Sequence, residues 1–453
     1  MSKLAWRNLV RMTASVFFAA GVAAPAMAQG VSEDSAEAAD ASGPIQIAQG
    51  RTTYEVPART EDRPRRGETV AGRARPQYDA LGARVGSFVF LPKLELQERY
   101  ETNIFATPNN EEDDFITRIL PRVRVASDWN NHQLQFDAGA AVGIHAQNPD
   151  EDYEDYFVGT SGRVDVRRST NVRLGVRYDH GHDDRSNPDD AGTGEEPTEF
   201  DEYTANTALF HNFGRLNATL DGSFGRITFD DVDTVGGGTN INHDRDRNVY
   251  EGGLRIGYEI VPEYEAFVRG SYNVRQYDGT DFGTGIDRDS NGYGVVVGME
   301  VDFGGLIFGD FFAGFRHQDY DDPTLDSLNG VGAGADITWN VTGLTTITGS
   351  LLSDVRETTQ AGASGRLVST GQIGIDHELL RNLILGADVG ATRDDYEGIN
   401  RTDWLYRAGI DATYLINRYL RVGADYDFVT RDADNANNDY TNHVFLVRVG
   451  LQY

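Results

Sequence analysis

Arginines recur at even spacings in several alternating segments of the chain, a pattern that could build a binding surface for anions. Guanidinium groups bind carboxylates and phosphates through charge and paired hydrogen bonds. The set comprises Arg118, Arg122, Arg124, Arg163, Arg167, Arg173, Arg177, Arg255, Arg269 and Arg275. Two interpretations stay open. The arginines line a path for anionic or polyhydroxylated cargo, or they pair with carboxylates on the same face, namely Glu95, Asp165, Glu251 and Glu265.

Other residues that could carry chemistry form weaker patterns. His180 and His182, followed by Asp183 and Asp184, could give two imidazoles and carboxylates to a transition metal. A lone His-x-His in a loop is weak support for such a site, and no Ser/His/Asp grouping indicates a hydrolase. We therefore predict no metal site, no cofactor and no catalytic residues. A protease or phospholipase whose site is assembled from distant segments of the chain stays a weak alternative.

Carboxylates crowd several loop-like segments, such as Glu111 to Asp114 and Asp150 to Asp152. They could bind calcium or bridge to lipopolysaccharide through divalent ions, but none has the spacing of an EF-hand loop. A solvated acidic surface is the simpler interpretation. The formal net charge of −30 argues against nucleic acid as a partner, because phosphate binding needs concentrated positive charge.

These residues are positioned by a repeating unit of alternating apolar and polar residues, which runs from Ser87 to Tyr453. In one example, Val172, Leu174 and Val176 alternate with polar residues or glycine, which places the two kinds on opposite faces of a strand. About eighteen such strands are separated by nine long and eight short connections. We therefore predict an all-β fold, a transmembrane antiparallel up-and-down β-barrel over residues 87–453, with the long loops outward and both termini in the periplasm.

The amino terminus differs from the repeat. Lys3, Arg7 and Arg11 precede an apolar run that begins at Met12 and ends in Ala26-Met27-Ala28, as in a signal peptide over residues 1–28. Residues 29–86, rich in Ala, Gly, Pro, Arg and Glu, are predicted to be a disordered periplasmic extension, with a plug or docking arm as the alternative. The chain has no cysteine, so its stability must come from hydrogen-bonded closure and lipid burial.

The last strand carries the most specific local signal. Its outward positions end on an aromatic residue and are Phe445, Val447, Val449, Leu451 and Tyr453. This pattern resembles the recognition strand that the outer-membrane assembly machinery binds. The alternative, the edge strand of an ordinary sandwich, would leave an apolar edge open to aggregation.

Motifs near the predicted barrel entrance carry a family resemblance. They are Arg75-Pro76-Gln77-Tyr78-Asp79-Ala80-Leu81-Gly82, Gly86-Ser87-Phe88, Tyr100-Glu101-Thr102-Asn103-Ile104-Phe105-Ala106-Thr107 and Asp113-Asp114-Phe115-Ile116. From residue 75 to 453 the chain resembles the putative β-barrel porin 2 family of outer-membrane proteins. The resemblance implies an outer-membrane pore, and some similar proteins serve exopolysaccharide secretion beside a periplasmic export protein. It implies no catalytic or ligand residue.

Three hypotheses for function follow, each in the outer membrane of a Gram-negative bacterium and none enzymatic. The first is a pore for exopolysaccharide, with a periplasmic polysaccharide export protein as a partner. The second is a general small-solute diffusion porin. The third is a structural or surface-binding protein that uses its acidic loops. Outer-membrane lipid, lipopolysaccharide and the barrel-assembly machinery are expected partners of all three.

Overall fold

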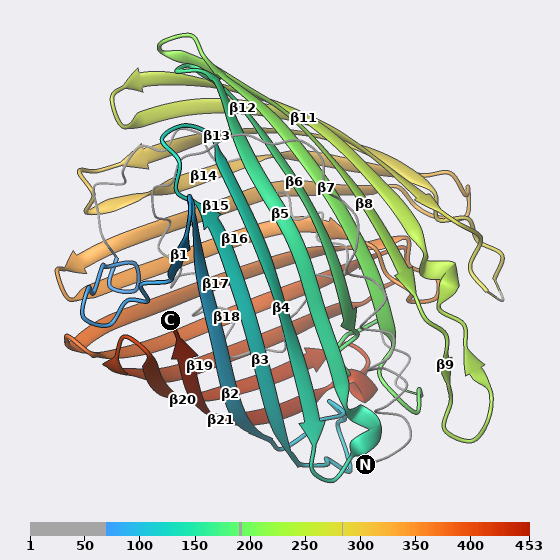
Figure 1. The fold of residues 1–453 in the computed structure, drawn as a ribbon. Helices are drawn as coiled ribbons and strands as arrows, with labels where there is room; N and C mark the ends of the chain where they lie inside the picture. Colours follow the sequence, from blue (N-terminus) through green and yellow to red (C-terminus); the bar gives the residue numbers. More distant parts are fainter. Residues whose placement is uncertain (1–68, 190–192, 283) are drawn as a thin grey trace.

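The fold is a closed antiparallel β-barrel (Figure 1). It is seen in a computed structural model that describes residues 69–189, 193–282 and 284–453. The predicted signal peptide and positions 29–68 of the predicted extension lie outside the described residues. Alternating apolar and polar residues form the strands because each strand presents one face to lipid and the other to the interior.

Eighteen strands make up the barrel wall. They are β2 (Phe88–Glu101), β3 (Asp114–Ser127), β4 (Gln133–His145), β5 (Tyr153–Arg167), β6 (Thr170–His182), β7 (Glu199–Asn212), β8 (Leu216–Phe229), β11 (Arg247–Val261), β12 (Tyr264–Tyr277), β13 (Ser290–Asp302), β14 (Ile307–Tyr320), β15 (Leu328–Thr342), β16 (Thr345–Arg356), β17 (Gly365–Leu380), β18 (Leu383–Glu397), β19 (Thr402–Asn417), β20 (Leu420–Ala433) and β21 (Tyr440–Gln452).

Each strand pairs antiparallel with the next one along the chain, and the last pairs with the first. In this closing pair, Lys93 of β2 lies opposite Gln452 of β21, and Glu101 lies opposite Val444. Closure leaves no open sheet edge, so every wall strand has partners for its backbone groups on both sides. The predicted fold class and strand number are confirmed.

Short elements lie at the two ends of the barrel wall. Strand β1 (Ala83–Val85) pairs with the start of β2, and the hairpin of β9 (Val232–Asp233) and β10 (Thr239–Asn240) lies between β8 and β11. Three single turns of 3-10 helix, η1 (Pro149–Glu151), η2 (His243–Arg245) and η3 (Ala436–Asn438), lie in the longer connections. In the part of the chain that the structure describes, no helix has the length and apolarity needed to span a bilayer.

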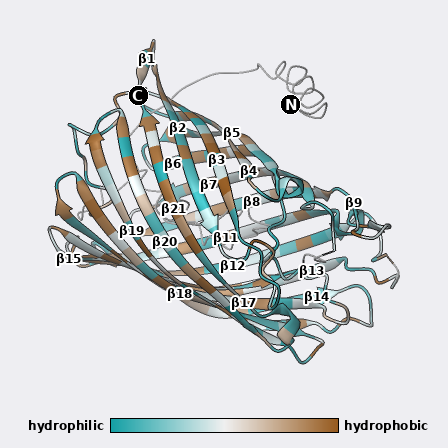
Figure 2. Cartoon of the chain, turned by 90° about the horizontal axis from the view of Figure 1, so that it is seen from below, coloured by the Kyte–Doolittle hydropathy of each residue, from teal (hydrophilic) through white to brown (hydrophobic). Residues whose placement is uncertain are grey.

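The wall strands alternate in side-chain character, as the sequence predicts (Figure 2). Leu174 and Val176 of β6 are 54% and 53% exposed on the outer surface. The predicted outward residues of the last strand also lie on that surface, and they are Phe445, Val447, Val449, Leu451 and Tyr453. An exposed apolar surface of this extent fits a lipid environment and would aggregate in water.

Strands β13, β14 and β15 approach one another closely at glycines. Gly309 has a φ of +152°, which few residues with a side chain adopt. A Cβ atom at this position would lie 1.8 Å from the backbone oxygen of Asp336 in β15. Glycine is therefore required at position 309 for β14 and β15 to pair.

Candidate functional site: the lumen and its two mouths

The barrel encloses a cavity of about 1610 Å³, bordered by inward side chains of the strands and by residues of the long loops. Its lining mixes polar and apolar residues and carries both signs of charge, with eleven arginines and twelve carboxylates. Arg118 and Arg275 of the predicted arginine set border it. A lining of this kind holds water and leaves little net charge in the cavity as a whole.

Several of the predicted inward arginines pair with carboxylates. Arg255 on β11 donates to Glu265 on β12 over 2.8 Å, and both side chains are only 2% exposed. Arg269 bonds Asp221 over 2.5 Å, with Glu251 at 3.4 Å. The two other carboxylates named from the sequence also have arginine partners: Asp165 with Arg163 at 3.1 Å, and Glu95 with Arg421 at 2.9 Å. The pairing interpretation therefore describes these contacts.

The remaining arginines of the set differ in the partners that they contact. Arg122 and Arg124 share Asp137, with 3.0 Å in each ion pair, and Arg177 binds Asp179 over 2.5 Å. Arg118 donates to Gln97 over 3.0 Å and is 1% exposed, whereas Arg275 pairs with Glu357 of the β16–β17 loop. Arg173 lies opposite Arg163 in the β5–β6 register, and Arg167 is exposed at the end of β5.

Strands β17 to β20 carry a group of aspartates that we call the acidic wall: Asp376, Asp388, Asp411, Asp425 and Asp427. Asp411 and Asp425 are directly opposite each other in the β19–β20 register. A Cβ atom at Gly409 would lie 2.6 Å from an oxygen of Asp388 and 2.9 Å from one of Asp427, so these carboxylates converge over the glycine. Arg407 and Arg448 pair with Asp427 and Asp425, at 2.8 and 3.3 Å. Two of the five carboxylates, Asp425 and Asp427, are thus paired with arginines.

A segment from one side of the barrel contacts the other side near the mouth where the long loops lie, which we call the outer mouth, the opposite one being the inner mouth. This crossing segment, residues 183–189, follows β6 and ends in Pro188 and Asp189. The Asp189 carboxylate accepts from Thr358 Oγ1 over 2.7 Å and from the Thr359 backbone N–H over 3.0 Å. It also forms an ion pair with Arg366 of β17 over 3.1 Å. Asp189 thereby joins the end of β6 to the β16–β17 loop, residues 357–364.

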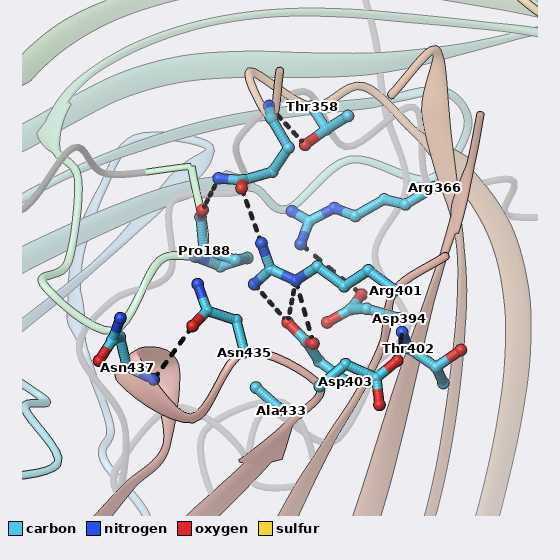
Figure 3. A network of polar contacts seen from close by, with 12 residues as sticks. Pro188, Thr358, Arg366, Asp394, Arg401, Thr402, Asp403, Ala433, Asn435 and Asn437 are labelled. Atoms are coloured by element: carbon cyan, nitrogen blue, oxygen red, sulfur yellow. Dashed lines mark hydrogen bonds and ion pairs between the residues drawn. The ribbon is translucent and has the colours of Figure 1, made fainter. Parts of the chain in front are cut away.

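A second chain of contacts lies beside the first (Figure 3). The Pro188 carbonyl accepts from the Gln360 side chain over 2.8 Å, and the oxygen of that side chain accepts from Arg401 over 2.7 Å. Arg401 is held in turn by Asp403, which accepts from its Nε and Nη2 atoms over 2.5 to 3.1 Å. In Figure 3, Arg366 and Arg401 point from the orange strands toward Pro188 on the green segment.

Electrostatics favour the ionised form of the Asp189 contact. Burial by itself would raise the pKa of the Asp189 carboxyl, but Arg366 and the hydrogen bonds from Thr358 and Thr359 outweigh it and hold the pKa below its ordinary value. Burial lowers the pKa of the Arg401 guanidinium, and Asp403, Tyr396 and Asp189 raise it more, so the net direction is upward. Both groups are therefore charged at neutral pH.

The inner mouth is bordered by residues 69–82, which we call the strap. The backbone N–H of Val70 donates to Thr346 on β16 over 2.9 Å. Arg73 and Arg75 both pair with Glu378 of β17 at 3.1 Å. Farther along, Gln452 of β21 donates to the Tyr78 carbonyl over 3.0 Å. The strap thus follows the inside of the rim from β16 to the closing seam.

This strap is the described end of the predicted extension, residues 29–86. Val70 is fully buried and Arg75 is 3% exposed, so this part is held against the barrel. Gly82 donates to the carbonyl of the terminal Tyr453 over 3.0 Å, and β1 then covers the start of β2. Residues 69–85 are therefore ordered against the barrel mouth, whereas the sequence predicts disorder over residues 29–86.

The two histidines of the predicted metal motif have different partners. His180 contacts Asp201 over 2.9 Å and stacks on Tyr156, whereas His182 contacts Asp155 over 2.8 Å and packs on Tyr153. Within residues 69–189, 193–282 and 284–453, no three His, Cys, Asp or Glu side chains are grouped so that they could hold a metal ion.

Sequence reasoning missed the residues that hold the two mouths. Asp189 stands in an acidic stretch that reads as a solvated loop, and Glu378 lies in a strand where every second residue faces inward. A possible signal was the position of Arg366 and Arg401, charged residues beside long loops at strand ends. Only the folded chain shows which loop they meet.

The comparisons with solved structures yield barrels at low identity. OpdL of Pseudomonas aeruginosa is 13% identical, with 81% of this chain and 99% of that chain covered and a TM-score of 0.43. The copper transporter OprC is 10% identical, with 82% and 81% covered and a TM-score of 0.47. The unliganded ferric citrate transporter FecA is 9% identical, with 84% and 80% covered and a TM-score of 0.44.

Among curated proteins, no sequence matches the chain. The family model described as putative β-barrel porin 2 matches residues 75–453, which include the whole barrel and most of the strap. The match covers the closing seam, the lumen wall and the long loops described above, and it agrees with the resemblance read from the entrance motifs. The chain belongs to the putative β-barrel porin 2 family.

Proposed function

We propose that this barrel is a diffusion pore for small polar solutes in the outer membrane of a Gram-negative bacterium. The supporting observation is a closed barrel of eighteen strands around a cavity of about 1610 Å³. A wall with this many strands leaves room for an aqueous lumen. The apolar outer surface and the wet, charged inner surface are the two faces that such a pore needs.

The contact across the outer mouth favours small solutes over a polymer as the cargo. A polymer chain needs a continuous opening through the barrel, whereas Asp189 and Pro188 join opposite sides of the mouth. Small solutes can pass beside such a contact. Passage of exopolysaccharide, alone or with a periplasmic export protein, is therefore the second candidate, and it requires the crossing segment to move away.

The charge of the lumen lining influences whether the pore favours cations or anions. Most arginines of the predicted anion path pair with carboxylates, as in the Arg255–Glu265 pair, whereas the acidic wall holds five carboxylates, of which Asp425 and Asp427 pair with arginines. A charged wall attracts ions of the opposite sign. We propose a preference for cations or neutral polyhydroxylated solutes over anions.

Export and assembly complete the proposal. Residues 1–28 direct the chain across the inner membrane as a cleaved signal peptide. The strand that carries Phe445, Val447, Val449, Leu451 and Tyr453 is the signal for the barrel-assembly machinery, and its exposed side chains are in the right place to be bound. Outer-membrane lipid and lipopolysaccharide are the surroundings of the apolar surface and of the outer loops.

The purified barrel in a planar bilayer tests the function. We expect single-channel conductance, a cation-favouring reversal potential in a salt gradient, and uptake of monosaccharides but not of long dextrans into liposomes. Uptake of dextrans at the rate of monosaccharides would favour the polysaccharide pore. A barrel that inserts without conducting either ions or sugars would refute both kinds of pore and leave the structural or surface-binding role.

A further inference from the structure

We propose that the contact of the crossing segment with the β16–β17 loop is the constriction that sets the size limit for solutes, and that Asp189 is its specificity-determining residue. The inference rests on the proposed pore function and deepens it. It assigns to one carboxylate the control of how large a solute can pass.

The crossing segment lies at the cavity of the barrel. Going around the wall from β6 to β16 passes eight inter-strand spacings, or about 38 Å at about 4.8 Å each. Asp189 is seven residues beyond His182, the last residue of β6, and seven extended residues span at most about 25 Å. The segment by itself is shorter than this path, and residues 183–189 and 357–362 border the same cavity, so the contact lies across the mouth of the lumen.

The crossing segment is fixed at its base. Arg185 pairs with Glu151 of η1 at 2.7 Å, and Arg245 of η2 pairs with Asp183 at 2.9 Å. All four side chains have an exposure of 12% or less. The base therefore belongs to the folded loop layer, and Pro188 and Asp189 at the far end are directed to a defined place.

The opposite side is fixed as well. Arg288 donates to the carbonyls of Ala363 and Ser364 over 3.1 and 3.4 Å, and Arg275 of β12 pairs with Glu357. These contacts hold both ends of the β16–β17 loop. Two prepared surfaces thus meet at the Asp189 carboxylate, which is the charged link between them.

The first experiment changes the link alone. In Asp189→Ala, the ion pair with Arg366 and the hydrogen bonds from Thr358 and Thr359 are lost. We expect single-channel conductance to rise about twofold, since conductance follows the open cross-section of a wet pore, and larger oligosaccharides to enter liposomes. The matched control is Asp150→Ala, which removes an exposed loop carboxylate of η1 and should leave conductance and size limit unchanged.

A second experiment restores the link by a covalent bond. The chain has no native cysteine, so Asp189→Cys combined with Thr358→Cys provides one defined pair at side chains that touch in the native protein. Oxidised, or joined by a short bismaleimide, the variant should have the wild-type conductance and size limit. Reduced, it should conduct like Asp189→Ala, and the change should reverse on the same protein.

The outcomes separate this inference from the pore function itself. Conducting wild type with unchanged conductance and size limit in Asp189→Ala and in the reduced cysteine pair would overturn the constriction and leave the pore. A silent wild type with a conducting Asp189→Ala would support the constriction as a complete closure. Silence of wild type and of all variants, with correctly folded barrels, would overturn both.

Discussion

Glu378 connects the strap to the barrel wall, and its replacement gives the most quantitative test of the inner mouth. Its carboxylate has an exposure of 4% and accepts from Arg73 and Arg75, whose side chains have exposures of 16% and 2%. The third partner, Arg381, is 54% exposed, and such a pair adds no more than about 1 kcal/mol. The effect of Glu378→Ala therefore depends on the two strap arginines.

The magnitude follows from burial. Removing one partner of a buried ion pair leaves an uncompensated charge and costs about 3 to 5 kcal/mol. With the lower figure, the opened population of the strap rises by about 150-fold, since about 1.4 kcal/mol corresponds to a tenfold change. The barrel wall should stay intact, because its strands are held by their own backbone hydrogen bonds.

Limited proteolysis of the folded barrel measures this population. Trypsin cleaves after arginine but not before proline, so Arg73 reports on the strap and Arg75, which precedes Pro76, does not. We expect cleavage between Arg73 and Ala74, identified by mass spectrometry, to accelerate by about two orders of magnitude in the regime where opening precedes slow cleavage. Glu378→Gln, which keeps an acceptor, should show a smaller increase.

The control removes an exposed ion pair close to the same seam. Arg84 and Asp128 have exposures of 61% and 43%, so Arg84→Gln should change cleavage at Arg73 by less than about fivefold. Equal cleavage rates in wild type and Glu378→Ala would refute the reasoning that the buried carboxylate holds the strap.

Further predictions concern the wall, the lumen and the constriction. Arg255→Met removes the arginine partner of the buried Glu265, which keeps a hydrogen bond from Asn217, and should lower the free energy of unfolding by about 3 kcal/mol. Heat-modifiability on gels should therefore show unfolding at a lower temperature, and an unchanged midpoint would contradict this. Asp388→Asn removes a charge that borders the cavity and should lower the cation-over-anion permeability ratio in a salt gradient, where a higher ratio would count against the acidic wall. The pKa of Asp189 is lowered, so its ion pair persists above the ordinary carboxyl value of 3.8 and is lost only as pH falls below it; conductance should be flat from neutral pH to about 5 and rise in stronger acid, and a rise near neutral pH would be inconsistent. Gly309→Ala places a Cβ against a neighbouring backbone oxygen, so folded barrel should be lost, as a gel-shift assay would show.

The wall could be predicted from sequence because one local rule governs all of it. Leu174 and Val176 take the outer face since each strand residue points opposite to its neighbour, and this rule needs no knowledge of distant residues. The same rule placed Arg255 and Glu265 on one inner face, where they pair. Strand number, loop lengths and closure followed from counting.

The mouths could not be predicted in this way. Asp189 reaches Arg366, which is 177 residues away in the chain, through a loop that has no periodicity. Arg73 and Arg75 stand in a Pro- and Arg-rich stretch whose composition indicates solvation, yet Glu378 buries them. Which polar groups meet across a barrel depends on its diameter and on loop direction, and neither is encoded in alternation.

The closing seam bears on how the chain reaches this structure. Asn103 and Asn442, which hydrogen-bond beside the seam, are 339 residues apart in sequence. The wall cannot close until the last strand has been made, and ordering so long a loop is entropically slow. Until then both edges of the sheet are exposed and can pair with other chains. The period before closure, rather than the finished barrel, is thus the stage at which unpaired strand edges expose this protein to aggregation.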